Sequence, residues 1–199
     1  MATEEGSTSG PAIVAVDPVD EGMLRQMAEL LVTGFVDMAP EAWPDLEAAM
    51  EEVREALGPD RARPRAALDA DGRVVGWIGA IVAYDGNVWE LHPIVVDPAH
   101  WKRGIGRALI ADLEERAREA GALTMYLGTD DVTGMTSLAG VDLYPGVLDH
   151  ARAIRSVRGH PFEFYRRCGY EVVGLLPDAN GFGKPDIFMA KRLQGGRDG

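Results

Sequence analysis

Apolar residues recur along the first 60 positions of the chain at the spacing of two amphipathic helices. Residues 13–16 alternate weakly and predict a short strand before them. Asp20 can then cap a helix whose buried face carries Met23, Leu24, Met27, Leu30 and Leu31. A second helix is predicted over residues 43–57, because Gly58 and Pro59 would end it. The chain is therefore expected to open with one strand and two helices.

Strand-like patterns follow in the middle of the chain. Residues 65–68 and 73–82 flank the turn DADG at 69–72, which predicts a β-hairpin because its glycine supplies a positive φ. Residues 89–96, WELHPIVV, predict another strand, which contains Pro93. A proline removes one hydrogen bond from a β-ladder, so we expect a bulge there. Backbone amides freed at this point could bind a ligand.

A loop, a helix and a strand are predicted in succession after this proline. The loop at 97–107 contains two glycines, and the helix over 108–120 carries a buried stripe of Leu109, Leu113 and Ala117. Residues 123–128 then return as a strand. Such a β-α-β crossover predicts that its two strands are parallel.

The C-terminal third mixes a long segment with shorter elements. A helix is expected within 147–157, a short helix over 161–168, and strands over 170–176 and 186–191. The whole order predicts an α/β fold with a mixed central β-sheet flanked by helices. One domain is expected over residues 13–193, between polar tails at 1–12 and 194–199 that cannot bury enough apolar surface to fold.

The charge of the chain limits its partners. Its 199 residues include 20 Lys and Arg against 32 Asp and Glu, a formal net charge of −12. This balance argues against binding of nucleic acid or an anionic membrane surface and suits a cationic partner. No apolar run is long enough to span a membrane, and Glu4 and Glu5 stand where a secretory signal would be basic. We therefore expect a cytoplasmic protein.

Metal and thiol chemistry find no support in the sequence. Cys168 is the only cysteine, so an internal disulfide or a multi-cysteine metal site is excluded. The four histidines, at 92, 100, 150 and 160, lack the spacing of a helical zinc motif. We expect no metal cofactor, and we interpret Cys168 as a small buried hydrophobe.

The glycine loop carries the first chemical signal. Residues 102–107, KRGIGR, place backbone N–H groups and cationic side chains at the start of a helix, which is an arrangement that binds anions such as phosphate. The nucleoside-triphosphatase P-loop pattern and the full dinucleotide-binding pattern are both absent. Taken alone, the loop could equally be a plain helix start.

The surrounding residues make this loop more specific. The run V-x-x-x-x-x-x-K-R-G-I-G-x-x-L-I, residues 95–110, resembles motif A of the GCN5-related N-acetyltransferase (GNAT) superfamily. The resemblance implies a GNAT fold in which a β-bulge opens a cleft for acetyl-CoA. It also implies that the loop binds the pyrophosphate of this co-substrate. The chain departs from the superfamily pattern at Trp101, where Gln or Arg is usual.

Four further motifs are similar, in order, to the aminoglycoside 6'-N-acetyltransferases. They are WELHP at 89–93, YLGTDD at 126–131, HPFEFY at 160–165 and the segment PDANG to KPDI at 177–187. The resemblance implies acetyl transfer to the 6'-amine of an aminoglycoside antibiotic by direct attack in a ternary complex, which confers resistance. It also implies a homodimer. The first 70 residues match only loosely.

The resemblance assigns roles to individual residues. Acetyl-CoA would lie against Ile94, Val95, Val96, Lys102, Arg103, Gly104, Ile105, Gly106, Arg107 and Tyr165, with an amide near Pro93, that of Val95, as the oxyanion donor. The catalytic candidates are Glu90, His92 and Tyr165. The candidates for binding the aminoglycoside are Phe35, Tyr84, Glu90, Asp130 and Asp131.

Chemistry supports these roles but leaves alternatives open. Glu90 can bind an ammonium group and accept its proton, directly or through water, with His92 as a relay, and Tyr165 can protonate the departing thiolate. The alternatives are a solvent-facing glutamate, a core histidine and a packing tyrosine. The protein could also acetylate another polyamine or a protein amine, or bind acyl-CoA or aminoglycosides without turnover.

Overall fold

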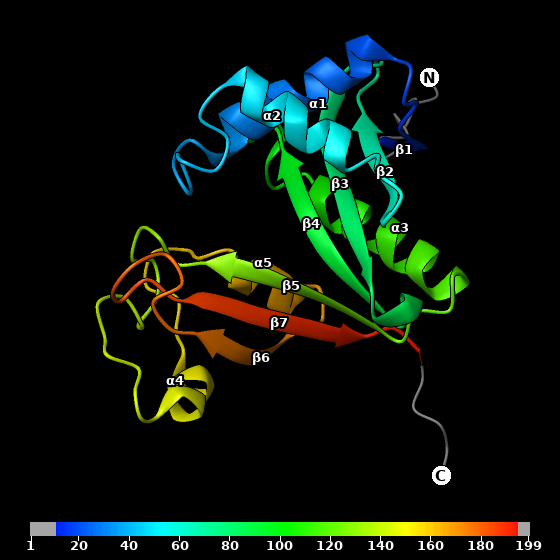
Figure 1. The fold of residues 1–199 in the computed structure, drawn as a ribbon. Coiled ribbons are helices and arrows are strands. Elements are labelled where there is room, and N and C mark those ends of the chain that lie inside the picture. The colour runs from blue at the N-terminus through cyan, green and yellow to red at the C-terminus, as the bar shows by residue number, and fades with distance from the viewer. Residues whose placement is uncertain (1–10, 195–199) are drawn as a thin grey trace, which may run out of the picture.

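The computed structural model describes residues 11–194, which form one seven-stranded sheet. Figure 1 shows the sheet, and its strand order is β1-β2-β3-β4-β5-β7-β6. The strands are β1 (Ala12–Ala15), β2 (Arg61–Leu68), β3 (Val74–Ala83), β4 (Val88–Val96), β5 (Thr124–Asp130), β6 (Glu171–Leu176) and β7 (Asp186–Arg192). The parallel β4–β5 pair sits among antiparallel neighbours, which confirms the predicted mixed sheet and crossover. Most of the expected tails lie outside the described residues, and β1 already includes Ala12.

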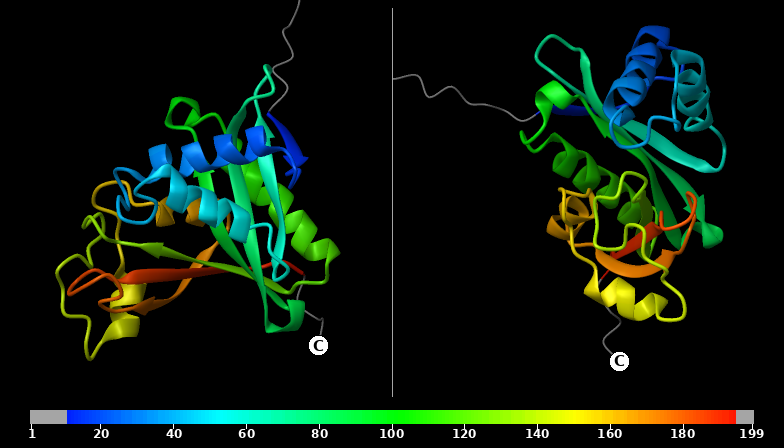
Figure 2. Two further views of the ribbon diagram at one scale, coloured as in Figure 1. Left: turned by 45° about the horizontal axis from the view of Figure 1, so that its top comes forward. Right: turned by 90° about the vertical axis from the view of Figure 1, so that its left-hand side faces the viewer.

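Helices cover both faces of the first four strands. Figure 2 shows α1 (Glu21–Phe35) and α2 (Leu46–Glu55) on one face and α3 (Ile105–Glu119) on the other. Trp77 of β3 is fully buried under α1, and its indole Nε1 donates a hydrogen bond of 3.0 Å to the carbonyl of Met27. This contact joins the apolar face of α1 to the centre of the sheet. No described helix is long and apolar enough to cross a membrane.

Local sequence signals set where the helices begin. The side chain of Asp20 accepts a hydrogen bond from the amide of Met23, which confirms the predicted cap of α1. α2 begins at Leu46, later than expected, because Asp45 caps it through the amide of Ala48. α3 begins earlier than expected, since Gly104 in the left-handed region, φ 85°, allows the helix to start at Ile105.

The C-terminal part carries two short helices. α4 (Val147–Ala153) packs beside β6, and α5 (Phe162–Arg167) contacts β7. α4 is shorter than the helix predicted within 147–157 because the chain turns extended at Ile154, ψ 134°. Ser156 then forms a β-bridge with Thr136. This pairing ties the two ends of the long segment together.

The strand with Pro93 contains the expected bulge. Ile94 of β4 pairs with Ile78 of β3, but Leu91 pairs with Ala80, so His92 and Pro93 together oppose Gly79. A Cβ on Gly79 would lie 2.8 Å from the backbone oxygen of His92. The close approach of the bulged backbone therefore requires a glycine here.

The sheet forks next to this bulge. β4 and β5 pair in three rows only, which end with Glu90 opposite Tyr126. Beyond that row the two strands diverge in Figure 1. Backbone groups of β4 that face the gap therefore have no ladder partner on β5 within residues 11–194. We call this feature the fork, and the functional candidates lie around it.

Candidate active site

A cavity of about 570 Å³ opens between the C-terminal half of β4, the start of α3 and α5. It brings together all predicted cofactor residues except Arg103. The lining residues are Gly34, Phe35, Met38, Ile94, Val95, Val96, His100, Trp101, Lys102, Gly104, Ile105, Gly106, Arg107, Pro161, Phe164, Tyr165 and Arg167. We call it the cofactor cleft.

The floor of the cofactor cleft is the start of α3. Gly104 provides no side-chain cap, so the first amides of this 15-residue helix remain open to an anion. Lys102 and Arg107 line the same cavity and add positive charge. A Cβ on Gly106 would lie 3.1 Å from the ring of Phe164, so the glycine lets α3 approach α5 closely. These features suit a phosphorylated, partly apolar ligand such as acetyl-CoA.

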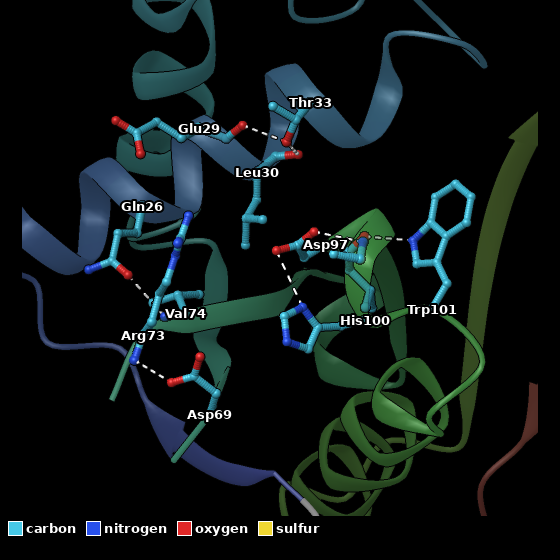
Figure 3. A network of polar contacts seen from close by, with 12 residues as sticks. Gln26, Glu29, Leu30, Thr33, Asp69, Arg73, Val74, Asp97, His100 and Trp101 are labelled. Atoms are coloured by element: carbon cyan, nitrogen blue, oxygen red, sulfur yellow. Dashed lines mark hydrogen bonds and ion pairs between the residues drawn. The ribbon is translucent and has the colours of Figure 1, made fainter. Parts of the chain in front are cut away.

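Trp101 has a defined place at this cleft despite its departure from the superfamily pattern. Its indole Nε1 donates a hydrogen bond of 2.7 Å to the carbonyl of Val96, and half of its side chain stays exposed. Figure 3 shows it beside the turn that carries Asp97 and His100, whose ion-pair distance is 3.3 Å. The side chain thus fixes the turn onto the end of β4.

Tyr165 reaches the cofactor cleft from α5. Only 8% of the residue is exposed, and its ring packs against Phe164 and Tyr170 with centroids 5.3 and 6.1 Å away. Burial raises the pKa of Tyr165 far above its ordinary value, so the phenol stays protonated. The phenol therefore carries a proton that a departing thiolate can take, and its raised pKa makes it a weaker acid than an ordinary tyrosine.

Glu90 lies at the fork and has a partner that sequence reasoning missed. The hydroxyl of Tyr126 donates a hydrogen bond to Oε2 of Glu90 at 2.5 Å. Burial, and then the bond to this carboxylate, raise the pKa of Tyr126 far above its ordinary value. Tyr126 stands within the matched motif YLGTDD, but only the pairing of β4 with β5 reveals the contact.

A second missed residue, Asp186, adds another carboxylate. Asp130 at the end of β5 and Asp186 at the start of β7 are direct cross-strand partners. Burial first, and then the charges of Asp130 and Glu90, raise the pKa of Asp186 to about 6, against two backbone hydrogen bonds that lower it. One oxygen, Oδ1, is buried without a hydrogen-bond partner. Glu90, Asp130 and Asp186 form what we call the acidic group.

Asp130 and Asp131 have different surroundings. Asp130 is exposed and accepts a hydrogen bond from the side chain of Asn180. Asp131 is only 1% exposed, and its carboxylate accepts hydrogen bonds from the amide of Met135 and from both the amide and the hydroxyl of Thr136. Asp131 therefore holds the loop after β5, which corrects its expected place in a substrate site.

The structure gives His92 a different neighbour from the one expected. Its Nε2 lies 3.6 Å from Oε1 of Glu52 in α2, and its ring lies 6.4 Å from that of Trp43. The contact with His92 lowers the pKa of Glu52 and burial raises it, and the net effect is a lowered pKa. Within residues 11–194 the polar contacts link His92 with α2 and do not link it with Glu90.

The two aromatic candidates lie in contrasting places. Phe35 lines the cofactor cleft and packs edge to face on Trp43, with centroids 4.6 Å apart. Tyr84 is 75% exposed in a turn next to β4. Trp43 was not predicted as a site residue, because it was marked only by the apolar spacing of the helix predicted over residues 43–57. In the part of the chain that the structure describes, no cluster of His, Cys, Asp and Glu could hold a metal ion.

Solved structures with the same fold include three aminoglycoside acetyltransferases. An aminoglycoside 6'-N-acetyltransferase solved with coenzyme A is 40% identical, with a TM-score of 0.85, and the match covers 94% of this chain and 99% of that one. The aminoglycoside 6'-N-acetyltransferase from Enterococcus faecium is 41% identical, with a TM-score of 0.84 and the same coverage. An aminoglycoside 6'-acetyltransferase of type Ii is 36% identical, with a TM-score of 0.70, covering 93% and 99% of the two chains.

Two further comparisons bear on the family. The comparison with curated protein sequences gives no match. The profile of the Acetyltransferase (GNAT) family matches residues 24–139, which include the glycine loop at 102–107, the bulge and the fork. The cofactor cleft provides the amides and cations that acetyl-CoA requires. The chain therefore belongs to the GNAT family and is an acetyl-CoA-dependent N-acetyltransferase.

Proposed function

We propose that this protein transfers the acetyl group of acetyl-CoA to the 6'-amine of aminoglycoside antibiotics and thereby inactivates them. The observation that carries the proposal is the acidic group, three carboxylates on neighbouring strands beside the fork. Aminoglycosides are polycations, and clustered carboxylates both attract and bind them. The names of relatives that are 36–41% identical over nearly the whole chain support the same substrate.

The cofactor end of the reaction rests on backbone and cationic groups. Acetyl-CoA supplies an acetyl thioester, whose carbonyl carbon is attacked by the acceptor amine. The open amides of α3, with Lys102 and Arg107, are suited to bind its pyrophosphate. The Val95 amide expected from the sequence points to β3, because Val95 lies opposite Trp77 and the amide two residues on, that of Asp97, donates to the carbonyl of Val75. The amide of Ile94, the first after the bulge, points the other way and would stabilise negative charge on the thioester oxygen. Tyr165 would protonate the thiolate that leaves.

The acceptor end rests on the fork. Glu90 would bind the ammonium form of the 6'-amine and take its proton directly or through water, since only the neutral amine is a nucleophile. Asp130 and Asp186 would bind other ammonium groups of the antibiotic. Phe35 and Tyr84 would contact the sugar rings, and His92 would act with Glu52 at the side of α2.

Thiol release tests this proposal. Purified protein is given acetyl-CoA with kanamycin, or with an analogue that carries a hydroxyl in place of the 6'-amine, and free CoA is followed with a thiol reagent. We expect release with the amine only. Release with neither compound, together with turnover of spermidine or a peptide amine, would contradict the aminoglycoside assignment and favour another amine.

A substitution at Glu90 tests the residue assignment. Glu90→Gln should lower kcat/KM for kanamycin roughly 100-fold or more, because a general base is lost. The Kd for acetyl-CoA should stay within about twofold, since Glu90 does not line the cofactor cleft. Glu115→Gln on the exposed side of α3 is the matched control and should change neither value. Equal weakening of both ligands would contradict the role of Glu90.

We further propose that the protein works as a homodimer in the cytoplasm. Resemblance to the aminoglycoside 6'-N-acetyltransferases supports the first statement. Light scattering during size-exclusion chromatography tests the first, with a molar mass near twice the 21.5 kDa of the chain as the expected result. Fractionation of the producing cells tests the second.

A further inference from the structure

Tyr126 occupies the last paired row before the sheet forks. β4 and β5 share the rows Val88–Thr124, Trp89–Met125 and Glu90–Tyr126, and no later row exists within the described residues. Neighbouring residues in one row of a parallel pair project to the same face of the sheet. The tyrosine is therefore the group on β5 that directly faces Glu90 at the point where an acceptor would enter.

The contact between these two side chains is short and directional. The Tyr126 hydroxyl lies 2.5 Å from Oε2 of Glu90, at the short end of the range for a phenol bound to a carboxylate. The phenol stays protonated at working pH, because burial and the adjacent carboxylate both raise the pKa of Tyr126. It is thus a permanent donor toward Glu90, and Oε1 is left for another partner.

A carboxylate held by one oxygen has lost most of its freedom to rotate. We propose that Tyr126 is a positioning residue, whose hydroxyl fixes the Glu90 carboxylate so that its second oxygen meets the ammonium group of the acceptor. The inference rests on the proposed function and deepens it. Neither the family assignment nor the roles given above includes this tyrosine.

Other charged groups around this pair must be considered in any titration. Tyr84 from the turn before β4 acts on Tyr126 through its charge. Asp186 of β7 interacts electrostatically with Glu90 and with Asp130 of β5. Glu90 and Tyr84 both raise the pKa of the Tyr126 phenol and so reinforce its role as a donor.

A double-mutant cycle on acceptor binding separates positioning from general structure. Calorimetry gives the Kd of kanamycin for the wild type, Tyr126→Phe, Glu90→Gln and the double variant. Tyr126→Phe alone should weaken binding and lower kcat/KM for the acceptor roughly 10-fold, the usual effect of a hydrogen bond to a charged group. In the Glu90→Gln background, Tyr126→Phe should raise the Kd of kanamycin by less than about twofold. KM for acetyl-CoA should not change, and exposed Tyr144→Phe serves as the matched control.

A titration tests the coupling without any ligand. In protein labelled with ¹³C at the tyrosine ring, the Tyr126 signal, assigned with Tyr126→Phe, should move to its ionised position at lower pH in Glu90→Gln than in the wild type. The reason is that the variant loses both the hydrogen bond and the charge that oppose ionisation.

The outcomes separate the inference from the proposed function. Additive losses in the cycle, or an unchanged Tyr126 titration in Glu90→Gln, would overturn the inference while wild-type acetylation of kanamycin stood. A wild type that neither binds nor acetylates aminoglycosides would overturn both.

Discussion

Replacing Asp186 by asparagine should stabilise the folded protein, and the gain should depend on pH. The pKa of Asp186 is raised from 3.8 to about 6 by burial and by the nearby carboxylates. Folding therefore favours the protonated form, and ionisation of Asp186 destabilises the folded state. The cost is absent well below pH 3.8 and reaches its full value above pH 6. Asparagine is neutral throughout and avoids it.

The size of the effect follows from the shift. At about 1.4 kcal/mol per pH unit, a rise from 3.8 to about 6 corresponds to up to about 3 kcal/mol at neutral pH. The side chain is only partly buried, so solvent screens part of this cost, and we expect a gain of about 1–2 kcal/mol. A gain near this value is large, because whole domains are stable by only about 5–15 kcal/mol.

Urea unfolding at several pH values measures the difference. The free energy of unfolding of Asp186→Asn minus that of the wild type should be small at pH 4 and rise to its plateau by pH 7.5. Asp71→Asn in the exposed turn between β2 and β3 is the matched control and should give a flat difference. A constant difference for Asp186→Asn across this range would refute the reasoning. The same variant should bind a polycationic acceptor more weakly, because it lacks one negative charge of the acidic group.

Two further substitutions test the bulge and the acid. Gly79→Ala should destabilise the protein by about 1–3 kcal/mol in urea unfolding, because its Cβ would meet the backbone oxygen of His92, whereas Gly174→Ala, with no atom within 4 Å, should not. Equal effects at both glycines would count against the bulge. Tyr165→Phe should lower kcat roughly 100-fold with an unchanged Kd for kanamycin, measured by single-turnover kinetics and calorimetry; an unchanged kcat would remove the acid role.

Local chemistry explains what the sequence could predict. The bulge at Pro93 follows from the missing amide of one residue, and the cap of α1 follows from the short side chain of Asp20. The cofactor cleft was predictable for a similar reason, since most of its polar groups come from one continuous turn before α3. Boundaries were less predictable, because Gly104 begins a helix where a glycine suggests a loop.

The acidic group shows why the rest could not be predicted. Asp186 meets Asp130 only because β7 inserts between β5 and β6, a pairing that the chain order does not reveal. Asp130 and Asp131 are adjacent in the sequence, yet one is exposed and the other binds its own loop. Tyr126 meets Glu90 across 36 positions of the sequence. Each of these contacts depends on packing between distant segments.

The fork also affects how such an enzyme can diversify. The turn proposed to bind the pyrophosphate of acetyl-CoA follows β4, whereas two carboxylates of the acidic group belong to β5 and β7, on the other side of the divergence. Only three rows of backbone pairing connect β4 with β5. Substitutions along the second half of the sheet can therefore change which amine is recognised while the ancestral co-substrate is kept, so one lineage can follow a changing set of antibiotics.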